Sequence, residues 1–125
     1  MIILKEESFQ IMGACFEVYK EMGAGFTEPI YHQSLILELQ SRNIPFASQP
    51  QLPVFFKGQK LDKKLIPDFV VFDQVILEIK SVRQLADEHR AQTLNYLKAT
   101  SKPLGLLVNF SGYPKLEYER FANTT

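Results

Sequence analysis

Charged residues stand inside two of the most apolar stretches of this chain. Glu78 and Lys80 lie in an apolar run that begins at Val75, and Asp68 directly precedes Phe69-Val70-Val71. Apolar runs of this kind form buried strands, where an unpaired charge costs several kcal/mol. Such a cost indicates that a partner, a metal ion or a function accompanies these charges.

The balance of charge narrows the possible functions. Fourteen basic residues match fourteen acidic ones, so the chain lacks the global positive field of proteins that coat nucleic acid nonspecifically. A polyanion would have to meet a local basic patch, and the best candidate is residues 57–64, with four lysines and one aspartate. Lysines at a hairpin tip explain this run equally well, because they block edge-to-edge aggregation.

The chain has a single cysteine and no long apolar run. Cys15 alone can form neither an intramolecular disulfide nor a multi-cysteine zinc site, so we expect it to be buried as a small apolar side chain. No leader with a cleavage site opens the chain, and no apolar run approaches the roughly 18 residues that span a bilayer. These features predict one domain over residues 1–125, a cytoplasmic location and no membrane association.

Apolar spacing predicts three helices. The first covers residues 6–22 and ends at Gly23-Ala24-Gly25, and the second starts after the N-cap Thr27 and ends at residues 41–43. The third runs from an Asp87 cap through Thr100. The expected inward positions are Ile11, Cys15, Val18 and Met22, widened by Phe9, Met12, Phe16 and Tyr19, then Leu35, Ile36 and Leu39, and finally Ala91, Leu94 and Leu97.

Five strands are predicted between and after these helices, at residues 52–57, 61–72, 75–82, 104–110 and 116–121. The first three would form a meander, with a bend near Pro67, because proline cannot donate to a ladder. The strand after the third helix can return parallel through a right-handed crossover. The order predicts an α/β fold with a mixed sheet flanked by helices.

The connection after Val71 decides whether the carboxylates meet. Alternation along the strand puts Glu78 and Lys80 on one face. A two-residue turn would pair Asp68 with Ile79, whereas an odd-numbered connection pairs Asp68 with Glu78. We predict the odd connection, or a bulge with the same effect.

Two carboxylates on adjacent strands repel each other unless they are protonated or bridged by a cation. Hard oxygen ligands suit Mg²⁺, or Mn²⁺ as its substitute, and the backbone carbonyl of Ile79 and waters could complete such a site with Asp68 and Glu78. Lys80 could orient a water or neutralise developing negative charge, which is the chemistry of phosphodiester hydrolysis. The alternative is that the two carboxylates form structural ion pairs with Lys80, Lys64 or Arg90.

A family resemblance favours the metal site over structural ion pairs. Pro67-Asp68 and Glu78-Ile79-Lys80 resemble the signature of the PD-(D/E)XK nuclease superfamily, and residues 25–31, Gly-Phe-Thr-Glu-Pro-Ile-Tyr, resemble the motif of its GxxExxY protein family. The likeness continues through residues 45–46, 52–54, 91–100 and 104–110. It implies a restriction-endonuclease-like αβββαβ core.

The resemblance also implies roles for single residues. Asp68 and Glu78 would bind the metal, Lys80 would assist the nucleophilic water, Glu28 on a preceding helix would complete the site, and Gln92 would lie near it. Relatives commonly carry a histidine where Tyr19 stands, so no role of that histidine is expected in this chain.

Simpler roles are expected for the other polar side chains. We interpret His32 as a surface residue, with an approach to the site one helical turn after Glu28 as the alternative, and His89 as a solvated or capping side chain. Tyr31 and Tyr96 are expected to be core-edge rings with hydroxyls on polar neighbours, and stacking on a flipped base is the alternative.

The leading hypothesis is therefore a Mg²⁺-dependent nuclease that acts on nucleic acid, in particular DNA, as a possible homodimer or part of a larger assembly. The alternative is a noncatalytic nucleic-acid-binding or protein-assembly module that keeps the fold. The zero net charge and the lack of a separate DNA-reading motif favour this alternative.

Overall fold

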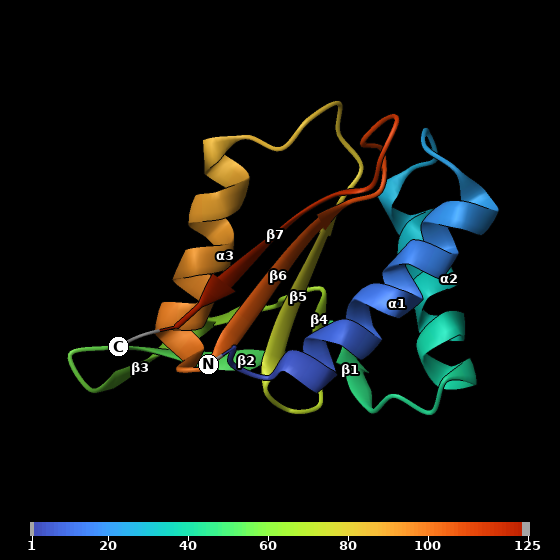
Figure 1. Ribbon diagram of the computed structural model, residues 1–125. Helices are drawn as coiled ribbons and strands as arrows, with labels where there is room; N and C mark the ends of the chain where they lie inside the picture. The colour runs from blue at the N-terminus through green and yellow to red at the C-terminus, as the bar shows by residue number, and fades with distance from the viewer. Residues whose placement is uncertain (1, 124–125) are drawn as a thin grey trace.

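The computed structural model describes residues 2–123 of the chain (Figure 1). Its elements are α1 (Lys5–Met22), α2 (Glu28–Ser41), β1 (Phe46–Ser48), β2 (Leu52–Phe56), β3 (Gln59–Leu65), β4 (Phe69–Val71), β5 (Val75–Lys80), α3 (Asp87–Thr100), β6 (Leu104–Asn109) and β7 (Glu117–Ala122). The main sheet has the order β1-β4-β5-β6-β7, and β5 and β6 are parallel while the other neighbours are antiparallel. This confirms the predicted α/β class and the parallel return after α3.

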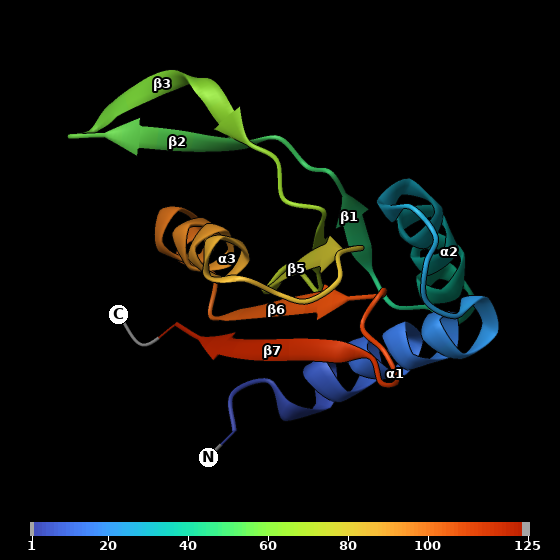
Figure 2. The same ribbon diagram turned by 90° about the horizontal axis from the view of Figure 1, so that it is seen from above.

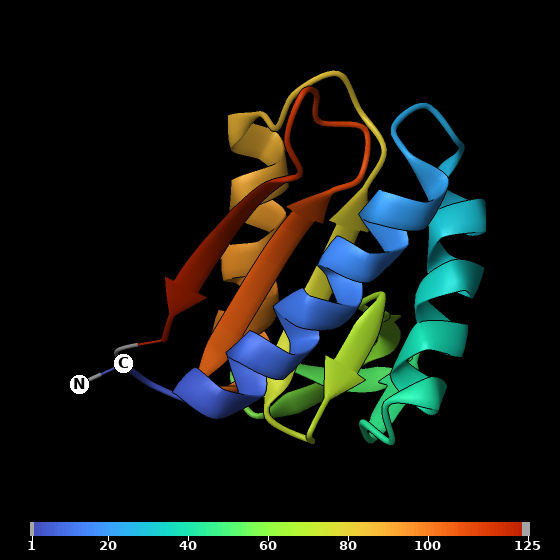
Figure 3. The same ribbon diagram turned by 45° about the vertical axis from the view of Figure 1, so that its right-hand side comes forward.

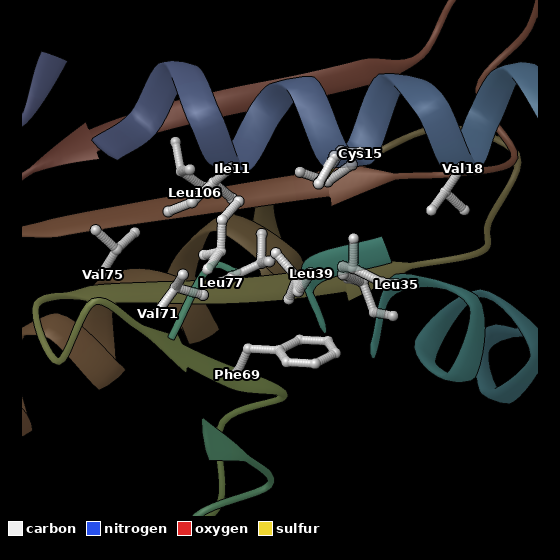
Figure 4. Packing of buried hydrophobic residues seen from close by; sticks show 14 of the residues in the cluster. Ile11, Cys15, Val18, Leu35, Leu39, Phe69, Val71, Val75, Leu77 and Leu106 are labelled. Atoms are coloured by element: carbon white, nitrogen blue, oxygen red, sulfur yellow. The ribbon is translucent and has the colours of Figure 1, made fainter. Parts of the chain in front are cut away.

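Helices cover both faces of this sheet. Figure 2 shows α1 on one face and α3 on the other, with α2 beside α1 near β1, and Figure 3 shows α1 lying across the sheet. The larger core joins α1 and α2 to the odd-numbered residues of β4 and β5, among them Phe69 and Leu77 (Figure 4). A smaller cluster of Val70, Ile76 and Leu97 lies under α3.

The first two helices match their predicted bounds. Glycine at position 23, with φ 74°, ends α1, because it adopts the left-handed backbone region without a steric cost. Cys15 is fully buried as expected, and burial raises the pKa of its thiol to about 12. The predicted stripe was too wide: Phe9 and Phe16 are 76% and 45% exposed, because α1 buries only the face that carries Ile11, Ala14, Cys15 and Val18.

The predicted inward face of α3 is confirmed for Leu97 and was wrong for Ala91 and Leu94, which are exposed. Thr93 and Leu97 are its buried residues, whereas Leu94 is 48% exposed. The reason lies in β6, where Gly105 lets the helix approach so closely that an added Cβ would come within 3.0 Å of Thr93 Cγ2. The predicted Asp87 cap was also wrong, because Ala86 is the N-cap. The Ala86 N–H donates to His89 Nδ1 at 2.9 Å.

The predicted three-stranded meander was wrong in one respect. The long middle strand splits into β3 and β4 around Pro67, because a proline cannot continue a ladder. Strands β2 and β3 then form a separate two-stranded sheet, while β4 pairs with β5 and with the unpredicted β1. A strand of three residues is too short for alternation to reveal it.

The predicted odd connection is confirmed. Val71 pairs with Val75 and Phe69 with Leu77, so three residues join β4 to β5. Two of these, Phe72 and Asp73, have positive φ.

Over residues 2–123, none of the helices combines the length and the apolar character needed to cross a membrane.

Candidate active site

The carboxylates of Asp68 and Glu78 lie side by side where β4 and β5 begin to separate. The Asp68 N–H donates to Glu78 Oε2 at 2.6 Å, and the Ile79 N–H donates to Asp68 Oδ2 at 2.8 Å. Each side chain is thus held by a backbone amide of the other strand. The register puts both on the α3 face of the sheet, as predicted.

The two carboxyl groups bind protons more tightly than ordinary ones. Burial raises the pKa of Glu78 to about 8, with a further contribution from the charge of Asp68. Burial also raises the pKa of Asp68, although the Ile79 amide and Lys80 oppose that shift. A site that holds two buried carboxyl groups so close together disfavours their ionisation unless a cation joins them.

Lys80 lies beside these carboxylates without forming a close ion pair with either. Its Nζ donates to Gln92 Oε1 at 2.9 Å, and the amide of Gln92 donates in turn to Tyr96 Oη at 3.5 Å. Among residues 2–123, no lysine, arginine or histidine nitrogen lies within 4.0 Å of an Asp68 or Glu78 oxygen. The alternative of structural ion pairs is therefore wrong for the described part of the chain.

Glu28 reaches the same place from the first turn of α2. It lines a surface cavity of about 220 Å³ with Asp68, and the other lining residues are Pro29, His32, Gln33 and Gln49. Burial and the charge of Asp68 raise the pKa of Glu28. Glu28 thus shares a cavity with Asp68, Glu78 is joined to Asp68 by the two backbone hydrogen bonds, and Gln92 is joined to Lys80.

His32 follows the alternative that it approaches the site one helical turn after Glu28, since it lines the same cavity as Glu28 and Asp68. It is half-buried in this cavity, stacks on Phe69 with ring centroids 4.3 Å apart, and has Nε2 2.8 Å from Ser48 Oγ. Burial lowers its pKa, and Glu28 opposes that effect. Gln33 and Gln49 were also missed, because Gln49 arrives on the loop after the unpredicted β1 and no residue pattern marks either side chain.

The glycine and tyrosine around Glu28 have structural roles. Gly25 has φ 107° and donates its N–H to Ser111 Oγ at 3.2 Å. The hydroxyl of Tyr31 donates to the Gly23 carbonyl and accepts the Phe26 N–H at 3.1 Å. These bonds fix the loop from which α2 starts, and so they fix the position of Glu28.

Replacing Tyr31 with phenylalanine should destabilise the protein by about 1–2 kcal/mol. The ring would keep its stacking on Phe110, but the part-buried Gly23 carbonyl and Phe26 N–H would lose their hydrogen-bond partner. Urea unfolding measures the change, with Tyr113→Phe as a matched control because Tyr113 is 85% exposed. Equal midpoints for both variants would contradict this role of the hydroxyl.

The donor set fits a hard divalent cation that keeps part of its water shell. Within residues 2–123, no three His, Cys, Asp or Glu side chains form a ready-made metal cluster. Mg²⁺ does not need one, since it is commonly bound by one or two carboxylates, waters and substrate phosphates. The Ile79 carbonyl points to the same strand edge as the Ile79 N–H that meets Asp68, so it is available as a further oxygen on that side.

Comparison with known families shows to which family the chain belongs. Residues 5–121 match the family model described as the PD-(D/E)XK nuclease superfamily. The chain belongs to the PD-(D/E)XK nuclease superfamily. The restriction-endonuclease-like class predicted for the fold agrees with this membership, and nucleases of the superfamily typically use divalent metals.

A solved structure supports the fold independently. The structure "Crystal structure of SSO0001" is similar to this chain, with a TM-score of 0.61 and 19% sequence identity. The similarity covers 78% of this chain and 50% of that one. The chain thus spans about half the length of that protein, and the likeness concerns the fold. No curated protein matches the chain.

Proposed function

We propose that this member of the PD-(D/E)XK superfamily is a Mg²⁺-dependent nuclease that hydrolyses phosphodiester bonds in DNA. One observation carries the proposal: Asp68 and Glu78 lie together on one sheet face beside Lys80, and within residues 2–123 no cationic side chain forms an ion pair with either carboxylate. The motif of Gly25, Glu28 and Tyr31 supports assignment to the GxxExxY family.

Asp68 and Glu78 would hold the ion, with the Ile79 carbonyl and Glu28 as further oxygen donors. Mg²⁺ bound there, with Mn²⁺ as a substitute, would supply a Lewis acid for the phosphoryl oxygen and would lower the pKa of a bound water. The backbone amides that bind Asp68 and Glu78 keep their oxygens in place before substrate arrives.

Lys80 has the second chemical role. Its ammonium group would orient the attacking water and offset the negative charge that develops on the phosphoryl oxygens. The water oxygen would bond to phosphorus and release one proton to solvent, the bond to the leaving oxygen would break, and that oxygen would take up a proton from solvent. Gln92 would act as a positioning residue, because its amide oxygen holds the Lys80 ammonium.

Calorimetric titration with Mn²⁺ separates this proposal from a noncatalytic module. The unaltered protein should bind Mn²⁺, and Asp68→Asn should weaken the binding by about tenfold or more, because a carboxylate ligand becomes a neutral amide. Asp87→Asn is a matched control, since Asp87 is exposed and pairs with Arg90 at the start of α3. Binding that is absent, or that is unchanged in Asp68→Asn, would favour the noncatalytic module.

A homodimer is a further part of the proposal. Two-fold pairing would let one site address each strand of a duplex. Sedimentation equilibrium of the protein with and without duplex DNA tests it, and a monomer in both conditions would contradict it.

A further inference from the structure

The β2–β3 hairpin stands apart from the main sheet. Figure 2 shows it on the α3 side of the molecule, extending beyond that helix. Its base is anchored, since Leu52 packs against the cluster of Val70, Ile76 and Leu97. Every residue of β3 before Leu65 is exposed, so most of this strand contributes nothing to a core.

The hairpin is basic, whereas the rest of the chain is acidic. Residues 57–64 hold four lysines and one aspartate, and because the chain has fourteen residues of each sign, the rest holds ten basic and thirteen acidic ones. The formal net charge is thus +3 along this segment and −3 over the rest of the chain, which favours contact of a polyanion with this segment.

These lysines are available to bind a ligand. Within residues 2–123, no acidic side chain lies within 4.0 Å of Lys57, Lys60, Lys63 or Lys64. The ammonium of Lys57 lies 5.4 Å from the ring centroid of Phe56. Phe55 and Phe56 are 59% and 61% exposed, and exposed aromatic rings among lysines are typical of surfaces that bind unpaired bases.

The hairpin is also connected directly to the candidate active site. Lys64 is four residues before Asp68, and Lys60 is eight residues before it. An extended chain covers at most about 3.5 Å per residue, so Lys60 lies within about 28 Å of Asp68, a distance of about eight base pairs. A nucleic acid strand that enters the site is thus within reach of the hairpin.

We propose that the β2–β3 hairpin is a nucleic-acid-binding arm that contacts the phosphate backbone several nucleotides away from the scissile bond. The lysines contact phosphates, and Phe55 and Phe56 provide stacking surfaces for bases where the strand is unpaired. The choice of nucleic acid as ligand rests on the proposed function, but binding by the arm does not require hydrolysis.

Fluorescence anisotropy in EDTA, where divalent ions cannot support cleavage, tests the arm with a labelled 20-nucleotide single strand and the corresponding duplex. The variant Lys57→Gln/Lys60→Gln/Lys63→Gln should bind both probes about 10–100-fold more weakly at 100 mM salt. For the single strand, the slope of log affinity against log salt concentration should become less steep by about 2, which is about 0.7 for each lost phosphate contact. Lys64 is left unchanged because it lies close to Asp68.

The control removes three exposed lysines outside the arm, in the variant Lys5→Gln/Lys20→Gln/Lys115→Gln. It should retain most of the affinity and the salt slope of the unaltered protein. Equal losses in the two variants would overturn the proposal, and so would the absence of salt-dependent binding by the unaltered protein. Arm-dependent binding without any cleavage in Mg²⁺ would overturn the proposed hydrolysis and leave the arm standing.

The two phenylalanines allow a second measurement. Phe55→Ala/Phe56→Ala should weaken binding of the single strand by about tenfold and of the duplex much less, because only unpaired bases can stack on the rings. Equal affinities for the single strand before and after this change would overturn the stacking role.

Discussion

Replacing Glu78 with glutamine should reduce Mg²⁺-dependent cleavage of DNA by at least about 10²–10³-fold. Glutamine retains an oxygen that can accept the Asp68 N–H, so the fold should survive, but the negative charge needed for the ion is lost. Lys80→Met should cause a loss of similar size, because it removes the ammonium group and keeps much of the side-chain volume.

Two control substitutions keep this prediction specific. Glu88 has 81% of its side chain exposed, so Glu88→Gln should cleave like the unaltered protein. Lys102 binds Asp73 at the opposite end of β5 from Lys80, so Lys102→Met should also remain active. Circular dichroism and urea unfolding establish that the variants are folded. Cleavage that persists undiminished in folded Glu78→Gln and Lys80→Met would refute the assignment.

The metal-free protein should lose stability as the pH rises from about 4.5 to about 8. In the folded state burial raises the pKa of Glu78 from 4.5 to about 8, so the folded protein holds a proton that the unfolded chain releases over this range. The contribution of Glu78 to the free energy of unfolding is complete below its pKa in the unfolded chain, and it is lost as the pH rises through its pKa in the folded protein. Asp68 and Glu28, whose pKa values burial also raises, act in the same direction.

Thermal unfolding in EDTA at pH 5 and pH 8 measures this loss. At pH 8, Glu78→Gln should melt about 5–10 °C above the unaltered protein, since it removes an unfavourable buried charge of order 2 kcal/mol. Mg²⁺ or Mn²⁺ should restore stability to the unaltered protein at pH 8 and have little effect on Glu78→Gln. A variant that melts below the unaltered protein at pH 8 in EDTA would show that Glu78 is not an uncompensated carboxylate.

Much of the site could be predicted from the sequence, because strand alternation and register are strong constraints. Glu78 and Lys80 share a face by the geometry of a strand, and the odd connection after Val71 brings Asp68 opposite Glu78. The charges within apolar runs also indicated correctly that these positions are unusual. The structure brings them together with no cationic partner among the described residues, whereas their roles in catalysis stay predictions.

What the sequence could not reveal depends on close packing and on short segments. Gly105 brings α3 so close to β6 that Thr93 turns inward in place of Leu94, and no periodicity of the helix alone predicts that. Gln49 and His32 line the cavity beside Asp68 because β1 and its following loop pack there, and a three-residue strand leaves no pattern to read. The end of α1 was predictable because Gly23 defines it locally, and β5 and β6 were predictable because each is a mainly apolar run.

The most direct test is a crystal of the protein soaked in Mn²⁺ and measured for anomalous scattering. We predict an anomalous peak in contact with the carboxylates of Asp68 and Glu78, and no such peak in a crystal of Asp68→Asn. An ordered site without a peak, or with both carboxylates bound to cationic side chains, would contradict it.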